Sequence, residues 1–190
     1  MLLTLLACAP HVPPVPHPPS AYEVVLHTSA GDVRLGVDRA LAPLGADHFY
    51  ELVQAGYYDG VRFDRVMPGF VAQFGFAADP ARTAAGAAHP VPIEPVRRSN
   101  TRGTLAWTNS GLPDSRTTVV FVNLADNPHL DAQGQTVFGE VVAGMDVLDA
   151  LPASCGGLSQ ERTEAEGEAY LSTACPGLLV IRRAEVVAPR

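Results

Sequence analysis

Apolar and polar residues alternate in short runs along most of the chain, and this period of two predicts β-strands. Eight such segments occur, at 22–28, 33–37, 61–66, 70–74, 103–107, 118–122, 136–142 and 178–187. The first two flank the turn sequence SAGD and form a predicted hairpin. Strands and helices do not alternate as in a parallel sheet, so we expect antiparallel pairing in a closed barrel or a sandwich.

Two segments have a helical spacing of apolar residues instead. The first is 42–56, which stops at Gly56, and the second is the shorter segment 144–151. These two helices could cap the open ends of a barrel. The stretch 75–102 is rich in Ala, Pro and Gly and predicts irregular structure.

Composition argues against one class of partner. The 190 residues carry 13 basic and 20 acidic side chains, for a formal net charge of −7. A nucleic-acid-binding surface needs concentrated positive charge to displace counterions, so we expect no nucleic-acid partner. Hydrophobic residues make up 47% of the chain, enough for one domain with its own core, which we expect to span 21–190 as a monomer.

The N-terminal twenty residues differ from the rest of the chain. The first eight, MLLTLLAC, resemble a bacterial lipoprotein signal that ends in a lipobox, with Cys8 as the acylated residue. Six prolines between Pro10 and Pro19 predict that 9–20 is a stiff, extended linker. We therefore expect an exported protein of the cell envelope or periplasm that contacts a membrane only through this lipid anchor. The alternative is an apolar N-terminus with an ordinary cysteine.

Cys155 and Cys175 are the other two cysteines. In an oxidising compartment they can form a disulfide, and the loop of 20 positions it closes would stabilise the fold by roughly 3 kcal/mol in the chain-entropy model. Two unpaired thiols are the alternative. Their spacing does not match a zinc site and no nearby histidine completes one, so we expect neither a metal nor a cofactor.

The segment FDRVMPGFVAQF, residues 63–74, places Arg65 and Gln73 among bulky apolar residues. A two-residue loop at Pro68-Gly69 would put these polar side chains on opposite faces of a hairpin, because successive side chains of a strand alternate. A three-residue loop, Pro68-Gly69-Phe70, pairs Arg65 with Gln73 directly. We predict the three-residue loop, which places both polar groups beside an apolar pocket.

Three ordered blocks of sequence resemble the cyclophilin family of peptidyl-prolyl cis-trans isomerases. They are HFYELVQAGYYDGVRFDRVMPGFVAQFG, then NTRGTLAW with TTVVFVNLADNPHLD, then TVFGEVVAGMDVLDAL. The resemblance covers nearly all of 22–187. It implies a closed eight-stranded antiparallel β-barrel capped by two α-helices, and an enzyme that rotates X-Pro bonds in proline-containing polypeptides.

The resemblance also implies roles for individual residues. Arg65 would be the donor that stabilises the twisted X-Pro bond, and Gln73 would orient it and bond to the substrate backbone. Phe70, Phe121 and Leu130 would line the slot for the proline ring. The other implied substrate-binding positions are Val71, Thr108, His129 and Asn109, whose backbone would hold the residue before proline.

Several positions depart from the family pattern. Asp64 replaces a usual histidine, and Val71 replaces a pocket methionine. Val119 and Val120 replace a glutamine and an aromatic residue, and Gln135 falls near a usual pocket histidine. The donor and the slot are retained, whereas the rim that grips the peptide is altered. The alternative function is therefore a proline-peptide-binding or chaperone module of the cell envelope with weak catalysis or none.

Overall fold

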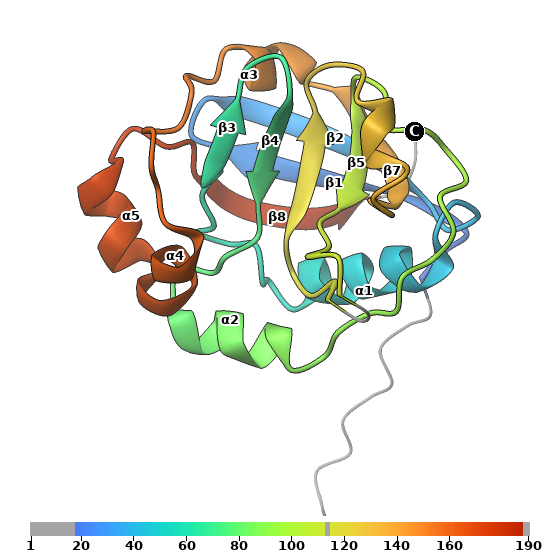
Figure 1. Ribbon diagram of the computed structural model, residues 1–190, viewed down its shortest axis with the longest axis horizontal. Helices are drawn as coiled ribbons and strands as arrows, with labels where there is room; N and C mark the ends of the chain where they lie inside the picture. Colours follow the sequence, from blue (N-terminus) through green and yellow to red (C-terminus); the bar gives the residue numbers. More distant parts are fainter. Residues whose placement is uncertain (1–17, 113–114, 188–190) are drawn as a thin grey trace, which may run out of the picture.

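The computed structural model describes residues 18–112 and 115–187, and the predicted lipidation site Cys8 lies outside this part of the chain. Within it, an eight-stranded antiparallel sheet curls around the core (Figure 1). The strands are β1 (Ala21–Thr28), β2 (Gly31–Asp38), β3 (Arg65–Met67), β4 (Val71–Phe74), β5 (Thr104–Trp107), β6 (Val120–Asn123), β7 (Val137–Ala143) and β8 (Ile181–Val187). The helices are α1 (Pro43–Gln54), α2 (Pro80–Ala87), α3 (Met145–Asp149), α4 (Gln160–Glu166) and α5 (Glu168–Ala174), with a 3-10 turn at Pro128–Leu130.

The strand order is β3-β4-β6-β5-β7-β2-β1-β8, with antiparallel pairing throughout, so the predicted β-dominated antiparallel fold is confirmed. The closed barrel is not shown, because no ladder joins the end strands β3 and β8 within the described residues. Ser154 covers the free edge of β3 instead: its N–H donates to the Val66 carbonyl at 3.0 Å, and its Oγ accepts from the Val66 N–H at 3.1 Å. A single antiparallel bridge, Arg62 to Val180, links the segments that precede the two end strands.

Alternation along the strands separates two apolar clusters on opposite faces of the sheet. The larger cluster fills the curl and includes Phe49 of α1, Trp107 of β5 and Phe138 of β7. The Trp107 and Phe138 rings stack with centroids 5.4 Å apart, and Phe49 lies 5.2 Å from Phe138. The smaller cluster consists of Val71, Ala106, Phe121, Leu130 and Val137, with Leu41 and Phe70 packed against it. This second cluster is the apolar floor of the site described below.

Helices α1 and α3 lie within the two segments predicted to be helical, at opposite ends of the curled sheet (Figure 1). The prediction of irregular structure for 75–102 is wrong at α2. Thr83 is the one buried residue described in that helix, so it has no apolar stripe for a pattern to reveal. The start signal was nevertheless present, since Asp79 accepts a hydrogen bond from the Ala81 N–H and Pro80 occupies the first turn.

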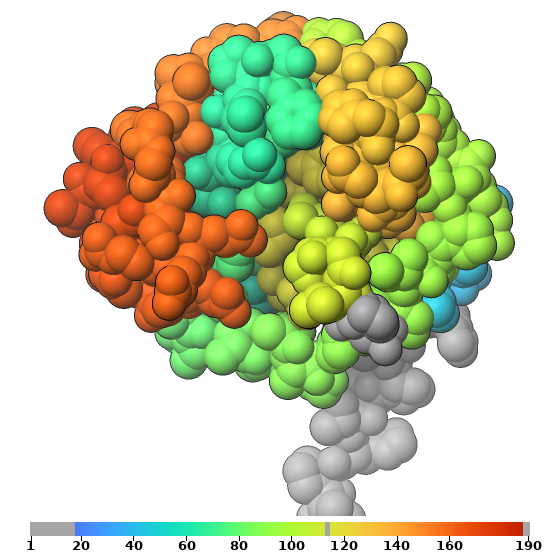
Figure 2. Space-filling model, in the orientation of Figure 1, coloured from blue at the N-terminus to red at the C-terminus, as the bar shows by residue number. Residues whose placement is uncertain are grey.

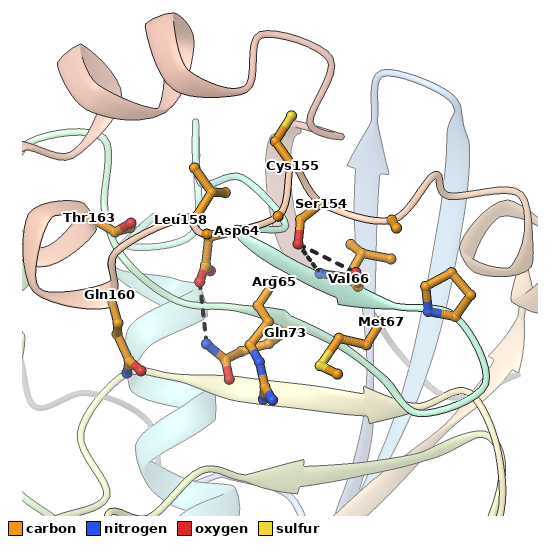
Figure 3. Close-up of a pocket in the computed structure, with 14 residues that line it drawn as sticks. Asp64, Arg65, Val66, Met67, Gln73, Ser154, Cys155, Leu158, Gln160 and Thr163 are labelled. Atoms are coloured by element: carbon orange, nitrogen blue, oxygen red, sulfur yellow. Dashed lines mark hydrogen bonds between the residues drawn. The ribbon is translucent and has the colours of Figure 1, made fainter.

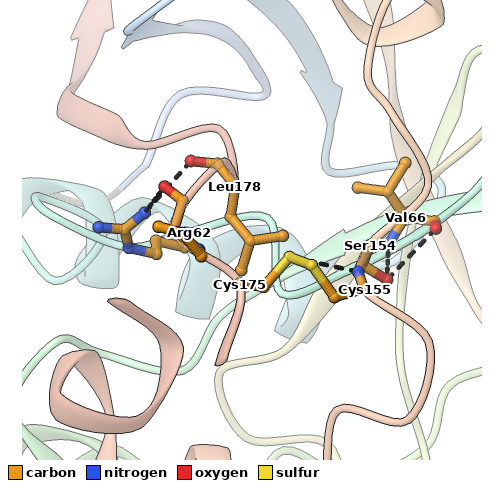
Figure 4. The surroundings of a disulfide bond; sticks show 7 residues. Arg62, Val66, Ser154, Cys155, Cys175 and Leu178 are labelled. Carbon is orange, nitrogen blue, oxygen red and sulfur yellow. Dashed lines mark hydrogen bonds between the residues drawn. A yellow bond between two sulfur atoms is a disulfide. The ribbon is translucent and has the colours of Figure 1, made fainter. Parts of the chain in front are cut away.

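The segment between the two late cysteines folds into α4 and α5, and Cys155 and Cys175 form a disulfide (Figure 4). Arg62 binds this segment to the sheet, because its guanidinium donates to both carboxylate oxygens of Glu168 at 2.6 and 2.7 Å and to the Leu178 carbonyl at 3.3 Å. None of the helices in 18–112 and 115–187 has the length and apolar character needed to cross a bilayer.

Candidate active site

The hairpin of β3 and β4 has the predicted three-residue loop. Arg65 lies directly opposite Gln73. The Phe70 N–H donates to the Met67 carbonyl at 2.9 Å, and Gly69 takes a φ of +73°, a left-handed conformation that glycine adopts without strain. The odd length of the loop is therefore confirmed, and it brings the guanidinium and the amide to one face of the hairpin.

The next strands extend that face. Gln73 of β4 lies opposite Phe121 of β6, and Phe121 lies opposite Ala106 of β5. Val71 is two residues before Gln73, so it shares the same face. The intervening residues of β4 and β6 enter the main core. A polar pair at the hairpin thus borders a small apolar floor, as the pattern of period two requires.

A cavity of about 240 Å³ opens on this floor, and we call it the aromatic cavity. Its lining residues are Arg65, Phe70, Val71, Gln73, Thr108, Asn109, Phe121, Leu130, Gln133, Gln135 and Gln160. Of the substrate-binding residues expected from the sequence, His129 is not among them. Its ring stacks on Phe70, with centroids 5.8 Å apart and an angle of 14° between the planes. His129 therefore supports a wall of the cavity through Phe70 and does not line it.

The Arg65 side chain is exposed at the rim of the aromatic cavity, with its guanidinium carbon 5.8 Å from the centroid of the Phe70 ring. It forms no hydrogen bond or ion pair with any residue in the described part of the chain. A guanidinium offers five N–H donors in a rigid plane and keeps its charge at any ordinary pH. These donors are therefore free for a ligand.

The side chain of Gln73 is oriented by a hydrogen bond to a buried carboxyl group, that of Asp64. Its Nε2 donates to Asp64 Oδ2 at 3.2 Å, and both residues are buried. Asp64 Oδ1 has no hydrogen-bond partner among the described residues. Burial, the largest cause, raises the pKa of Asp64 to about 7, against the opposing effects of its own backbone N–H, of Gln73 and of the Arg65 charge. The carboxyl group thus orients the amide of Gln73 and does not neutralise Arg65 by an ion pair.

Asn109 lies on another wall, and its backbone is already engaged. Its N–H donates to Gln135 Oε1 at 3.0 Å, and its carbonyl accepts from Gln135 Nε2 at 3.3 Å. The Asn109 side chain donates to the carbonyls of Gln133 and Gly134. The glutamine amide therefore occupies the backbone of Asn109, which the family resemblance expects to hold the residue before proline.

A larger cavity of about 550 Å³ adjoins the aromatic cavity, and we call it the disulfide cavity (Figure 3). Arg65, Gln73 and Gln160 line both cavities. Figure 2 shows a hollow between the hairpin, drawn in teal, and the orange segment that contains α4. Sequence analysis missed Gln160, because nothing in the α4 sequence indicates that this residue reaches the sheet. No group of three His, Cys, Asp or Glu side chains in 18–112 and 115–187 could hold a metal ion.

The buried acid predicts a pH-dependent stability. Because its folded-state pKa lies above that of an unfolded chain, the ionisation of Asp64 costs no stability below about pH 4, and the cost of ionisation continues to grow up to about pH 7. We expect the free energy of unfolding of the natural protein to fall between pH 5 and pH 8 by roughly 2 to 3 kcal/mol more than that of Asp64→Asn. Urea denaturation at the two pH values measures this difference, and identical pH dependence in both proteins would contradict it.

Comparison with known proteins identifies relatives of this chain. The family model of the cyclophilin type peptidyl-prolyl cis-trans isomerases matches residues 23–168. A peptidyl-prolyl cis-trans isomerase A of Dickeya dadantii is 36% identical over 170 residues, covering 86% of this chain and 84% of that protein. A peptidyl-prolyl cis-trans isomerase of Acinetobacter baylyi is 37% identical over 145 residues, covering 72% of this chain and 77% of the relative.

Solved structures agree on the fold. The chain is similar to a cyclophilin type peptidyl-prolyl cis-trans isomerase of Cryptosporidium parvum, with a TM-score of 0.64 and 20% sequence identity over 90% of this chain and 99% of that one. A second structure of the same isomerase, in the presence of the dipeptide ala-pro, gives a TM-score of 0.61 at 19% identity, over 88% of this chain and 99% of that one. Sequence and fold together show that the chain belongs to the cyclophilin type peptidyl-prolyl cis-trans isomerases.

Proposed function

We propose that the aromatic cavity receives the proline ring of a polypeptide and that Arg65 speeds rotation about the X-Pro bond. The observation that carries the proposal is the unpaired guanidinium of Arg65 at the rim of a cavity floored by Phe70, Phe121 and Leu130. A ring without polar groups fits such a floor, and a free cation beside it can reach the atoms of the adjoining amide.

The chemistry requires little more than this arrangement. An X-Pro bond resists rotation because resonance gives its C–N bond partial double-bond character, and unaided isomerisation takes tens to hundreds of seconds. In the twisted transition state the resonance is lost and the prolyl nitrogen regains a lone pair. An N–H of Arg65 aimed at that lone pair stabilises the twisted form more than the planar form, which is the condition for catalysis.

Gln73 is proposed to orient both Arg65 and the substrate. Its amide nitrogen is committed to Asp64, so the amide oxygen is the group left to accept a hydrogen bond from the guanidinium or from a peptide N–H. Because Gln73 is buried and held across the hairpin from Arg65, the acceptor is in place before substrate arrives. No proton transfer, nucleophile or metal enters this scheme.

Two observations support a substrate class: the size of the aromatic cavity and a related solved structure. The cavity of about 240 Å³ suits a proline ring with the amide that precedes it, and a solved relative from Cryptosporidium parvum was crystallised in the presence of the dipeptide ala-pro. We propose proline-containing polypeptides as the partners of this chain.

A second candidate function is a proline-peptide-binding or chaperone module with weak catalysis or none. The contact between Gln135 and the Asn109 backbone supports the weak catalysis, because a peptide that paired with Asn109 during the reaction would first have to displace two hydrogen bonds. Both candidate functions use the aromatic cavity, and they differ in whether the rate of X-Pro isomerisation is raised.

We also propose that the protein is exported and lipid-anchored, and that its clients are folding proteins of the cell envelope. The N-terminal MLLTLLAC, with its lipobox-like end at Cys8, supports this location. The disulfide of Cys155 and Cys175 supports it independently, since such bonds form and persist in oxidising compartments.

Replacing the proposed donor tests catalysis directly. Arg65→Ala should lower the rate of catalysed isomerisation at least about 100-fold, the usual cost of removing a donor to a developing charge. A protease-free isomerisation assay on a proline peptide measures it. Arg183→Ala is the matched control, because Arg183 lies on β8 and lines neither cavity. A natural protein that binds the peptide without accelerating it would establish the second candidate function instead.

Removing the internal amide tests the role of Gln135. Gln135→Ala frees the Asn109 N–H and carbonyl, so peptide affinity should rise by about 3- to 10-fold, the worth of one hydrogen bond. Isothermal titration with a proline peptide measures the dissociation constant. Gln133→Ala is the control, because Gln133 lines the same cavity and holds Asn109 through its backbone carbonyl alone. Weaker binding by Gln135→Ala would show that Gln135 holds Asn109 in its working position.

Lipidation at Cys8 predicts a simple labelling result. In bacteria fed labelled palmitate, the full-length protein should carry the label and sediment with membranes, and Cys8→Ser should lose both properties, because the acyl chains are the anchor. Cys155→Ser, which breaks the disulfide and leaves Cys8 intact, is the control and should remain labelled. An unlabelled natural protein in the soluble fraction would rule out the anchor.

A further inference from the structure

We infer that the disulfide cavity is a second binding subsite, which holds uncharged residues next to the substrate proline, and that Gln160 contacts the bound polypeptide there. The inference rests on the proposed function, because it takes the occupant of the aromatic cavity to be a proline-containing polypeptide.

Continuity between the two cavities supports a shared occupant. Arg65, Gln73 and Gln160 line both of them, so the two spaces lie side by side at these three residues. The disulfide cavity is also more than twice as large, at about 550 Å³ against about 240 Å³. A chain whose proline lies in the aromatic cavity passes Arg65 on its way into the larger space. Residues that flank the proline are therefore the natural occupants.

The two walls of the disulfide cavity come from distant parts of the sequence (Figure 3). One wall is the β3 strand with its turn, from Arg65 to Pro68, and the other is the segment 153–158 that carries Cys155. At Gly156 and Gly157 an added Cβ would meet nothing within 4 Å, so the backbone there faces open space. Exposed peptide groups on one side, and a hairpin on the other, suit a bound backbone.

Gln160 lies where the cavities meet. It is exposed at the start of α4, and its amide has no hydrogen-bond partner in the described part of the chain. It also lines a third cavity of about 350 Å³ beside Thr108 and Asn109. A glutamine amide carries both a donor and an acceptor, which is the same pair of groups that a peptide unit presents. Gln160 can therefore bond to a peptide backbone without selecting its side chains.

The position of Gln160 is set before any ligand binds. The preceding residue, Ser159, accepts from the Arg162 N–H at 3.2 Å through its side chain and donates its own N–H to the Tyr170 hydroxyl at 3.0 Å. The Arg162 guanidinium carbon lies 4.2 Å from the centroid of the Tyr170 ring. These contacts, with the disulfide and the Arg62 contacts to Glu168 of α5, fix α4 at the edge of the disulfide cavity. A preformed contact loses less conformational entropy on binding.

Charge narrows the class of ligand. Arg65 is the exposed charge in the disulfide cavity, since Asp64 is buried and the other lining side chains carry no charge. An acidic residue beside the proline would pair with Arg65 and occupy donors that the reaction needs. Uncharged residues leave the guanidinium free, so the subsite favours an uncharged polypeptide segment.

Two peptides of different length separate this subsite from the proline cavity. The short peptide carries one residue on each side of proline, and the extended peptide adds several uncharged residues at both ends. Gln160→Ala should lower kcat/KM for the extended peptide by about 3- to 10-fold more than for the short one, the effect of one hydrogen bond that only the longer chain can make. Gln54→Ala is the matched control, because Gln54 is an exposed helical glutamine that lines neither cavity. The double variant Cys155→Ser with Cys175→Ser should show the same selective loss.

Each outcome decides the inference. No change on the extended peptide, or an equal loss on both peptides, would overturn it. If the natural protein accelerates neither peptide, the proposed catalysis fails, and the subsite is then tested by dissociation constants from NMR titration. Tighter binding of the extended peptide that is lost in Gln160→Ala would support the subsite, and equal binding of the two peptides would overturn it.

Discussion

The register of one short hairpin determines which polar side chains lie beside the aromatic cavity. A strand turns a side chain to the opposite face at every residue, so the loop between β3 and β4 decides whether Arg65 and Gln73 share a face. With three residues in the loop they do, and Phe121 of the neighbouring strand joins them. With two residues, either the guanidinium or the amide would be directed away from the apolar floor. The catalytic proposal and the second subsite both depend on this register.

Arg65 has no ion-pair partner among the described residues because the carboxyl group of its neighbour in sequence, Asp64, is buried and bonded elsewhere. An ionised Asp64 against the guanidinium would form an ion pair and occupy the donors that a substrate needs. The carboxyl is instead buried and accepts from Gln73, and burial raises its pKa to about 7. The protein thereby accepts a cost in stability near neutral pH, because a carboxylate without full hydrogen bonding is held in the interior. As a result, the amide of Gln73 is oriented by the Asp64 carboxyl group, and the guanidinium of Arg65 remains without an ion-pair partner in the part of the chain that the structure describes.

Local patterns in the sequence predicted the parts of the fold that local forces determine. The strands, α1, α3 and the hairpin loop follow from alternation, helical spacing and turn chemistry. Barrel closure was expected and is not shown, because Ser154 satisfies the edge of β3 from a distant loop. Helices α2, α4 and α5 were missed, because each has only seven or eight residues, and α2 and α4 have no apolar stripe. The family resemblance assigned Phe70 and Phe121 to the proline slot. Without it, these two aromatic residues would have been interpreted as ordinary core residues.

The contacts of the site that the sequence did not reveal share one property: they join segments that are distant in the chain. Gln135 reaches Asn109 across 26 positions, and Gln160 lines the same cavity as Gln73 because a disulfide and an ion pair hold the segment of α4 and α5 beside the hairpin. No period or spacing encodes such contacts.

This difference also separates two tasks within the site. Arg65, Val71, Gln73 and Phe121 lie on strands, where a shift of one residue would invert every neighbour, so their geometry is rigid and suits catalysis. Asn109, Gln135 and Gln160 lie on strand-connecting segments and at the start of a short helix, where a single side chain can change without altering the sheet. In this arrangement the residues proposed to contact the polypeptide can vary while those proposed to turn the X-Pro bond stay the same.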